Sequence, residues 1–96
     1  MANGARGEVM AWLAGAERRL CLTLGALAEI ETALGVDGIG GLVERMRTLS
    51  ARDLMVVLTA LLRGGGEGAL AERLGEAAVD PREAANAVAR AFEASA

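Results

Sequence analysis

The side chains that most often perform acid–base catalysis or bind a metal are scarce in this chain. It contains no histidine and a single cysteine, Cys21. Histidine is the commonest general base and metal ligand, and without it Cys21 has no partner that would activate it as a nucleophile. A free cysteine on a strand behaves as a small hydrophobic residue, so we expect Cys21 to be buried. One cysteine also excludes an intramolecular disulfide and fits a reducing compartment.

Two glycine clusters have the composition of phosphate-binding loops but not their spacing. Gly64-Gly65-Gly66 is followed by neither Lys-Ser nor Lys-Thr, and it ends a helix instead of joining a strand to one. Gly38-Ile39-Gly40-Gly41 lacks the third glycine of the dinucleotide fingerprint. Glu72 and Glu76 are four residues apart and could face a cation together, but a solvated helix face is the commoner role of such a pair. The sequence therefore predicts no enzyme, no metal site and no cofactor.

Composition narrows the classes of partner. The net charge is −3, from 13 acidic and 10 basic residues, whereas nucleic-acid binding needs a basic excess or a basic stripe. The longest strongly apolar run, Leu54 to Leu62, is nine residues long, and a membrane span needs about 20. The first ten residues lack the apolar run of a signal peptide. We expect a soluble, cytoplasmic protein that binds neither nucleic acid nor membrane.

The N-terminal part of the chain predicts a β-hairpin. Residues 8–13 and 18–23 alternate in the manner of two strands, joined by a turn at 14–17. On the first strand, Val9, Ala11 and Leu13 share one side, which leaves Trp12 on the other. A lone hairpin is marginal in water, so its apolar side must pack on helices or on another chain.

The remainder, residues 24–94, predicts helices. Start and stop signals favour a fold that is mainly α with an N-terminal β-hairpin (α+β), in which four to five short helices pack on a two-stranded antiparallel hairpin. Thr23, Asp37, Ser50 with Asp53, and Asp80 before Pro81 are the expected caps. The expected helices span residues 24–34, 38–47, 51–63, 69–78 and 81–94, with a flexible glycine-rich connector at 64–68 and a loose N-terminus at 1–6, all within one domain, 1–96.

Two features suggest contact with other proteins. Trp12 is either covered within the monomer or exposed at an interface, where tryptophan is enriched. The helix at 51–63 is apolar nearly all round, which implies either a central place in the fold or burial by a partner. Its leucines form one stripe, so we expect Val56, Val57 and Ala60, which lie outside that stripe, to contribute to association.

Several segments together resemble a known family. Gly7-Glu8-Val9, the glycine turn, the run from Arg19 to Gly35, Leu49-Ser-Ala-Arg-Asp-Leu54 and Leu61-Leu-Arg-Gly-Gly-Gly66 resemble a small protein encoded in the tail gene cluster of gene transfer agents and related prophages. The resemblance covers about residues 7–66, and residues 67–96 match more loosely. Members are described as tail assembly chaperones and sometimes as tail tube proteins.

The resemblance implies a tail assembly chaperone whose partners are the tape measure protein and the tail tube protein, and self-association remains open. The alternative is a structural component, in the tube or at its end, that is retained in the particle. Tube proteins generally build rings through β-sheet edges, whereas one hairpin and four to five helices are predicted here, which favours the chaperone. The family carries no catalytic motif to transfer, in agreement with the scarcity of catalytic residues.

Overall fold

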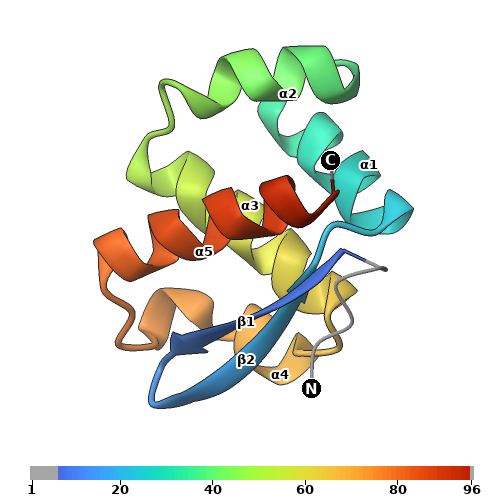
Figure 1. The fold of residues 1–96 in the computed structure, drawn as a ribbon. Helices are drawn as coiled ribbons and strands as arrows, with labels where there is room; N and C mark the ends of the chain where they lie inside the picture. Colours follow the sequence, from blue (N-terminus) through green and yellow to red (C-terminus); the bar gives the residue numbers. More distant parts are fainter. Residues whose placement is uncertain (1–6, 96) are drawn as a thin grey trace.

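The computed structural model describes residues 7–95, and the expectation of a loose end at 1–6 lies outside them. A two-stranded hairpin is followed by helices (Figure 1). The predicted class, mainly α with an N-terminal hairpin, is confirmed. The elements are β1 (Glu8–Leu13), β2 (Ala16–Cys21), α1 (Leu24–Leu34), α2 (Gly38–Met46), α3 (Ala51–Gly64), α4 (Gly68–Glu72), the 3-10 helix η2 (Leu74–Glu76) and α5 (Pro81–Ser95).

The hairpin is tighter than expected. Leu13 pairs with Ala16, so only Ala14 and Gly15 form the turn. Both have positive φ, 53° and 81°, which is the two-residue turn whose twist matches that of the strands. The second strand therefore begins at residue 16, two residues earlier than the predicted strand at 18–23. The prediction placed the turn at 14–17 because alanine in a left-handed conformation gives no local sequence signal.

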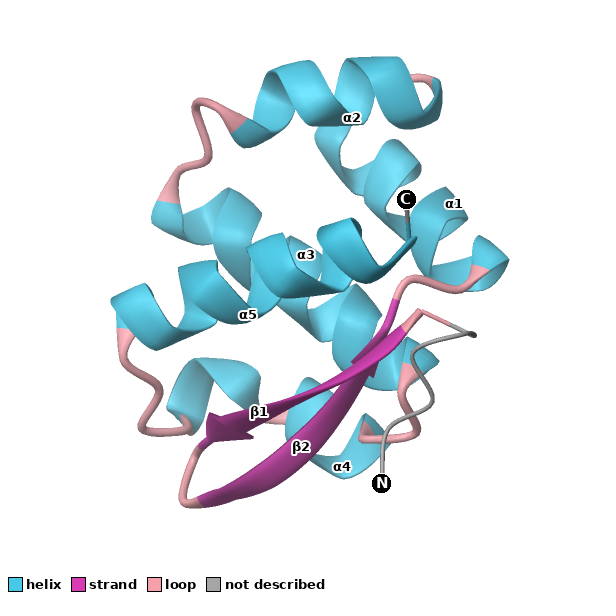
Figure 2. Ribbon diagram, viewed as in Figure 1, coloured by secondary structure: helices cyan, strands magenta, loops and turns pink. Residues whose placement is uncertain are grey.

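The hairpin's two faces differ in burial. Leu13 and Leu20 are buried while Trp12 is 61% exposed, so the predicted alternation on the first strand is confirmed. Helix α5 packs on β1, and α3 packs on β2 (Figure 2). Cys21 is buried at the end of β2, as expected.

Helix α3 occupies the centre of the fold. Its start is the predicted capping box, in which the Ser50 hydroxyl accepts from the Asp53 backbone N–H and the Asp53 carboxylate accepts from that of Ser50. The helix contacts α1, β2, α4 and α5. Its buried side chains are Val57, Leu58, Ala60, Leu61 and Leu62. Neighbouring elements of the monomer thus surround the C-terminal half of α3, which accounts for the apolar residues on nearly all sides of this helix.

The segment 64–68, predicted as a glycine-rich connector, packs against β2. A Cβ on Gly64 would lie 2.2 Å from the carbonyl oxygen of Cys21, and one on Gly65 would lie 2.0 Å from that of Arg19. Glycine is therefore required where the end of α3 crosses the outer edge of β2. The Glu67 carboxylate then accepts the Arg19 backbone N–H at 2.9 Å. The local sequence indicates only a helix end at these glycines, because their approach to β2 joins parts of the chain that are distant in sequence.

Helices α1 and α2 differ in how they begin. Thr23 caps α1 by accepting the Ala26 N–H at 3.0 Å, as predicted, and Gly35 ends α1 with φ of 69°. Asp37 does not cap α2 with its side chain. The Gly38 N–H instead donates to the Glu31 Oε2 at 2.6 Å, so a carboxylate on α1 satisfies this donor.

The side chain of Arg45 connects α2 to both α1 and α3. Arg45 donates to the carbonyl of Leu34 at 3.1 Å and to the Asp53 carboxylate at 2.9 Å. Among the described side chains of α2, only Leu42 is buried, and α2 lies at the opposite end of the molecule from the hairpin (Figure 1). Helix α2 is thus a peripheral element, held by the buried Leu42 and the partly buried Met46 and by the polar contacts of its ends.

The C-terminal third differs from prediction in detail. The expected helix at 69–78 is divided near Arg73 into α4 and η2. Helix α5 begins as predicted, with the Asp80 carboxylate accepting the Arg82 N–H at 2.7 Å. The buried residues of α5 are Ala84, Ala87, Val88 and Ala91. No helix within residues 7–95 has both the length and the hydropathy of a membrane span.

Candidate functional site

Polar chemistry is not concentrated at any place in residues 7–95. No group of three or more His, Cys, Asp or Glu side chains there could hold a metal ion, and no charged or polar residue among them is buried. The surface features that stand out are apolar. The exposed large hydrophobic residues are Trp12, Leu24, Val43 and Met55.

The four residues predicted to bind partners are not equally accessible. Val57 and Ala60 are fully buried, at 0% exposure, so their expected exposure is wrong. Both lie in the part of α3 that is enclosed by its neighbouring helices and the hairpin. Val56 is half-buried, and Trp12 is 61% exposed. Trp12 and Val56 line no common groove, so the structure does not bring these two together.

Met55, which sequence analysis did not single out, lies at the edge of an apolar cleft. The cleft has a volume of about 240 Å³. It is formed by the N-terminal half of α3, by η2, and by the chain that leads into α5. None of its lining residues is charged: Ala51, Leu54, Met55, Leu58, Leu74, Gly75, Ala77, Val79, Pro81 and Ala84. Such a lining suits aliphatic side chains from a partner.

A second groove lies between α1 and α3, and Met55 borders this one too. It is lined by Glu29, Ala33, Arg52, Met55, Val56 and Thr59. Met55 is 44% exposed and therefore forms a ridge with a groove on each side. We call Met55 and these two grooves the Met55 surface. Methionine is unbranched and polarisable, so it adapts to differently shaped partners.

A third groove extends the apolar region towards α2. Its lining includes Met46 and Leu49 on one side and Val88 and Ala89 on the other, with Leu54 shared with the first cleft. The first turns of α3 are thus bordered by grooves, while its C-terminal half is enclosed. Of the residues predicted on α3, Val56 lines the second groove, while Val57 and Ala60 are enclosed.

A signal for Met55 was present in the sequence. Arg52, Thr59 and Arg63 lie three, four and eight residues away from it, which places them on the same helix face as Met55. Polar residues at that spacing mark a face that meets solvent. The leucine stripe alone hid this face, because it grouped residues by hydrophobicity and not by their polar neighbours.

Charged pairs hold both ends of the Met55 surface. Arg63 on α3 forms an ion pair with Glu29 on α1, and Arg45 pairs with Asp53 at the start of α3 at 2.9 Å. The hydrogen bond from Arg45 lowers the pKa of Asp53 below its usual value, partial burial acts against this, and the Ser50 backbone N–H adds to the lowering. Within residues 7–95, Arg52 makes no ion pair, which leaves one cation available on the groove wall.

The hairpin does not present open edges at its centre. On β1, the carbonyl of Met10 accepts a hydrogen bond from the Arg90 guanidinium of α5 at 2.6 Å. On β2, the Arg19 N–H is bonded to Glu67, and Gly65 lies against the Arg19 carbonyl. Covered edges resist the addition of a further strand. These contacts disfavour ring building through this sheet.

Comparison with known protein families gives a match over nearly the whole chain. A family model described as "Phage tail tube protein, GTA-gp10" matches residues 6–95, nearly the whole chain. Neither the curated proteins nor the solved structures contain a match.

Proposed function

Because the chain belongs to the phage tail tube protein family GTA-gp10, we propose that it is a tail assembly chaperone of a gene transfer agent or prophage. In this role it binds the tape measure and tail tube proteins in the cytoplasm of the producing cell and catalyses no reaction. Membership of the family supports a phage tail component. The Met55 surface is the observation that carries the finer assignment.

The Met55 surface suits an amphipathic helix. A tape measure is a long helical protein whose apolar stripes would aggregate if left bare. Aliphatic side chains spaced three and four residues apart on such a helix can enter an apolar groove in succession. The first cleft has a volume of about 240 Å³ and an uncharged lining, so it can accept these side chains. The flexible side chain of Met55 can adjust to successive side chains along the stripe.

Charge supports the same partner. Arg52 on the wall of the second groove makes no ion pair within the described residues, so an acidic residue beside the partner's apolar stripe would find a cation there. The net charge of −3 favours a soluble complex once the apolar stripe is covered.

Co-expression with the tape measure protein tests the proposal. Met55→Glu places a charge between the two grooves and should reduce the captured tape measure by about ten-fold or more. Leu24→Glu is the matched control, since Leu24 is 83% exposed but lines none of the grooves. Both variants should keep the thermal unfolding midpoint of the wild type. Equal capture by the wild type and both variants would rule out the Met55 surface as the docking site.

The second candidate is a structural component of the tail tube or its end. The family's description as a tail tube protein favours it. A tube subunit of this kind needs accessible sheet edges, whereas the edges of this hairpin are occupied at Met10 and Arg19. The two candidates differ in whether the protein stays in the finished particle.

A further inference from the structure

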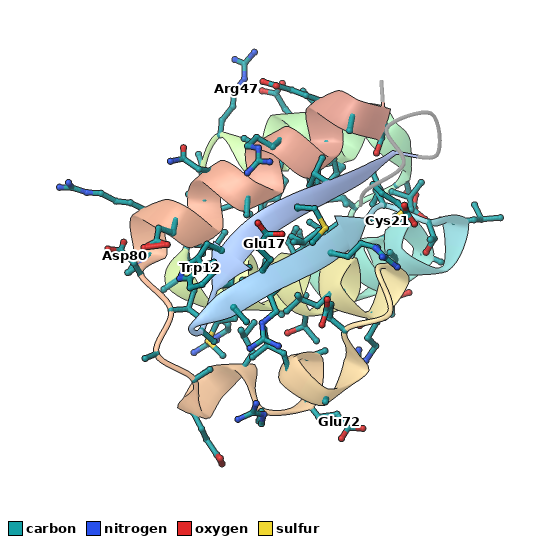
Figure 3. The ribbon with its side chains drawn as sticks, turned by 60° about the horizontal axis from the view of Figure 1, so that its bottom comes forward. Trp12, Glu17, Cys21, Arg47, Glu72 and Asp80 are labelled. Carbon is teal, nitrogen blue, oxygen red and sulfur yellow. The ribbon has the colours of Figure 1, made fainter. Side chains whose placement is uncertain are left out.

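The outer face of the hairpin carries a compact set of residues whose side chains make no hydrogen bond or ion pair within residues 7–95. Trp12 lies opposite Glu17, and Met10 lies opposite Arg19 in the neighbouring cross-strand pair. All four side chains point away from the face that holds Leu13 and Leu20. Figure 3 looks onto this hairpin, with Trp12 and Glu17 near its turn and Cys21 at its far end. We call Met10, Trp12, Glu17 and Arg19 the hairpin face.

Both charges of the hairpin face lack an ion-pair partner. Within residues 7–95, neither Glu17 nor Arg19 forms a salt bridge. The Nε of Arg19 is buried and has no hydrogen-bond partner, a condition that folded proteins normally avoid because a buried, unpaired donor is unfavourable. The two residues lie two apart on β2, about 7 Å along the strand, and do not pair with each other. Arg19 as a whole is only half-buried, so a carboxylate from outside would pair with the accessible part of its charged side chain and not with the buried Nε.

The apolar part of the face has the composition of an interface centre. Trp12 is 61% exposed, and Met10 beside it is half-buried. Tryptophan, methionine and arginine are the residue types enriched in the buried centres of protein interfaces. An exposed tryptophan next to an unsatisfied arginine is therefore a candidate contact and not merely a solvated strand.

We propose that the hairpin face binds the hairpin face of a second copy of this chain, an inference independent of the proposed chaperone role. The two copies would be related by a two-fold axis that lies between their hairpin faces, perpendicular to the strands and midway between the two cross-strand pairs. This axis places each cross-strand pair of one copy over the other pair of the second copy. It places Glu17 of each copy over Arg19 of its partner copy, and Trp12 over Met10. Two-fold contacts are self-complementary in this sense. The order of charges on β2 meets that requirement without any further residue.

A second copy explains the charges better than an unrelated partner does, because the face carries both the cation and the carboxylate that the contact needs. The face is small. Two six-residue strands offer much less than the area of about 800 Å² per partner in a stable complex. Association should therefore be weak, with a dissociation constant on the order of 10–100 µM, and promoted where copies are concentrated.

Charge reversal with complementation tests the proposal by sedimentation velocity over a concentration series. Wild type should dimerise, while Glu17→Arg and Arg19→Glu should each weaken dimerisation by about ten-fold or more, since like charges then face each other twice. An equimolar mixture of the two variants should dimerise again, because every contact in the mixed dimer is between opposite charges. A merely structural role for either residue would not give this recovery.

The fluorescence of Trp12, the only tryptophan in the chain, provides the second readout. Its emission should shift to shorter wavelength as the wild type is concentrated, and in the mixture but not in either variant alone. Leu24→Ser, which alters an exposed apolar residue outside the face, should behave as wild type. Circular dichroism confirms that each variant is folded. A monomeric wild type at all concentrations, or an emission shift only on addition of tail tube protein, would overturn the second-copy assignment.

Discussion

Among the described glycines, Gly65 is the one at which an added Cβ would approach another atom most closely. Alanine there would place a Cβ 2.0 Å from the carbonyl oxygen of Arg19. Both groups belong to packed backbone, so α3 and β2 would have to separate. We expect Gly65→Ala to lower the free energy of unfolding by about 3 kcal/mol, measured by urea denaturation.

Gly40→Ala is the matched control for that substitution. A Cβ at Gly40 would meet no atom within 4 Å, and alanine favours a helix over glycine by about 0.5–1 kcal/mol. The control should therefore be slightly stabilising. Similar small effects at both positions would show that the end of α3 does not approach β2 as closely as the structure has it.

Asp53 predicts how stability depends on acid pH. Its pKa is lowered from the usual 3.8, chiefly by the hydrogen bond from Arg45. A carboxyl with a lowered folded-state pKa contributes stability above its unfolded-state pKa and loses it as the pH falls through the folded value. The difference in unfolding free energy between wild type and Asp53→Asn should therefore be constant near neutral pH and shrink below about pH 4. A difference that does not change with acid pH would contradict the pairing with Arg45.

At the scale of the elements, α3 has one enclosed half and one accessible half. Val57 is fully buried, and an aspartate there would bury an unpaired charge. We expect Val57→Asp to lower the free energy of unfolding by more than about 3 kcal/mol, and Met55→Asp by less than about 1 kcal/mol. Thermal unfolding followed by circular dichroism measures both. An equally stable Val57→Asp variant would mean that α3 is not central.

The helices with local signals were predicted well. Thr23 before α1, Ser50 with Asp53 before α3, and Asp80 before α5 form their cap hydrogen bonds as expected. Each of these contacts joins residues two or three apart, so the sequence alone contains both partners. The predicted cap at Asp37 is wrong, because the Gly38 backbone N–H donates instead to the carboxylate of Glu31, seven residues before it. Local spacing does not show such competition.

The candidate site was predicted less well, for a physical reason. Whether Val57 or Met55 meets solvent depends on which side of α3 the hairpin and α4 occupy. That choice is set by the approach of Gly64 and Gly65 to β2, a contact between segments about 45 residues apart in sequence. The apolar residues outside the leucine stripe of α3 do not by their spacing separate Val56, which lines a groove, from Val57, which is buried.

At the scale of the whole molecule, one hydrophobic core joins the hairpin to α1, α3 and α5, while apolar grooves remain along the first turns of α3. A chain of 96 residues has few elements with which to cover a central helix on every side. The uncovered part is therefore available to other tail proteins. A transient chaperone and a permanent tail component would both use this surface. They differ in fate, that is, in whether the protein remains in the finished particle.

Quantitative mass spectrometry of purified particles, compared with the lysate of the producing cells, measures that fate. The chaperone role predicts that the protein is recovered with the tape measure in the lysate and is absent from finished particles. Its presence in finished tails at a copy number comparable to that of the tube subunit would contradict the chaperone role and establish the structural one.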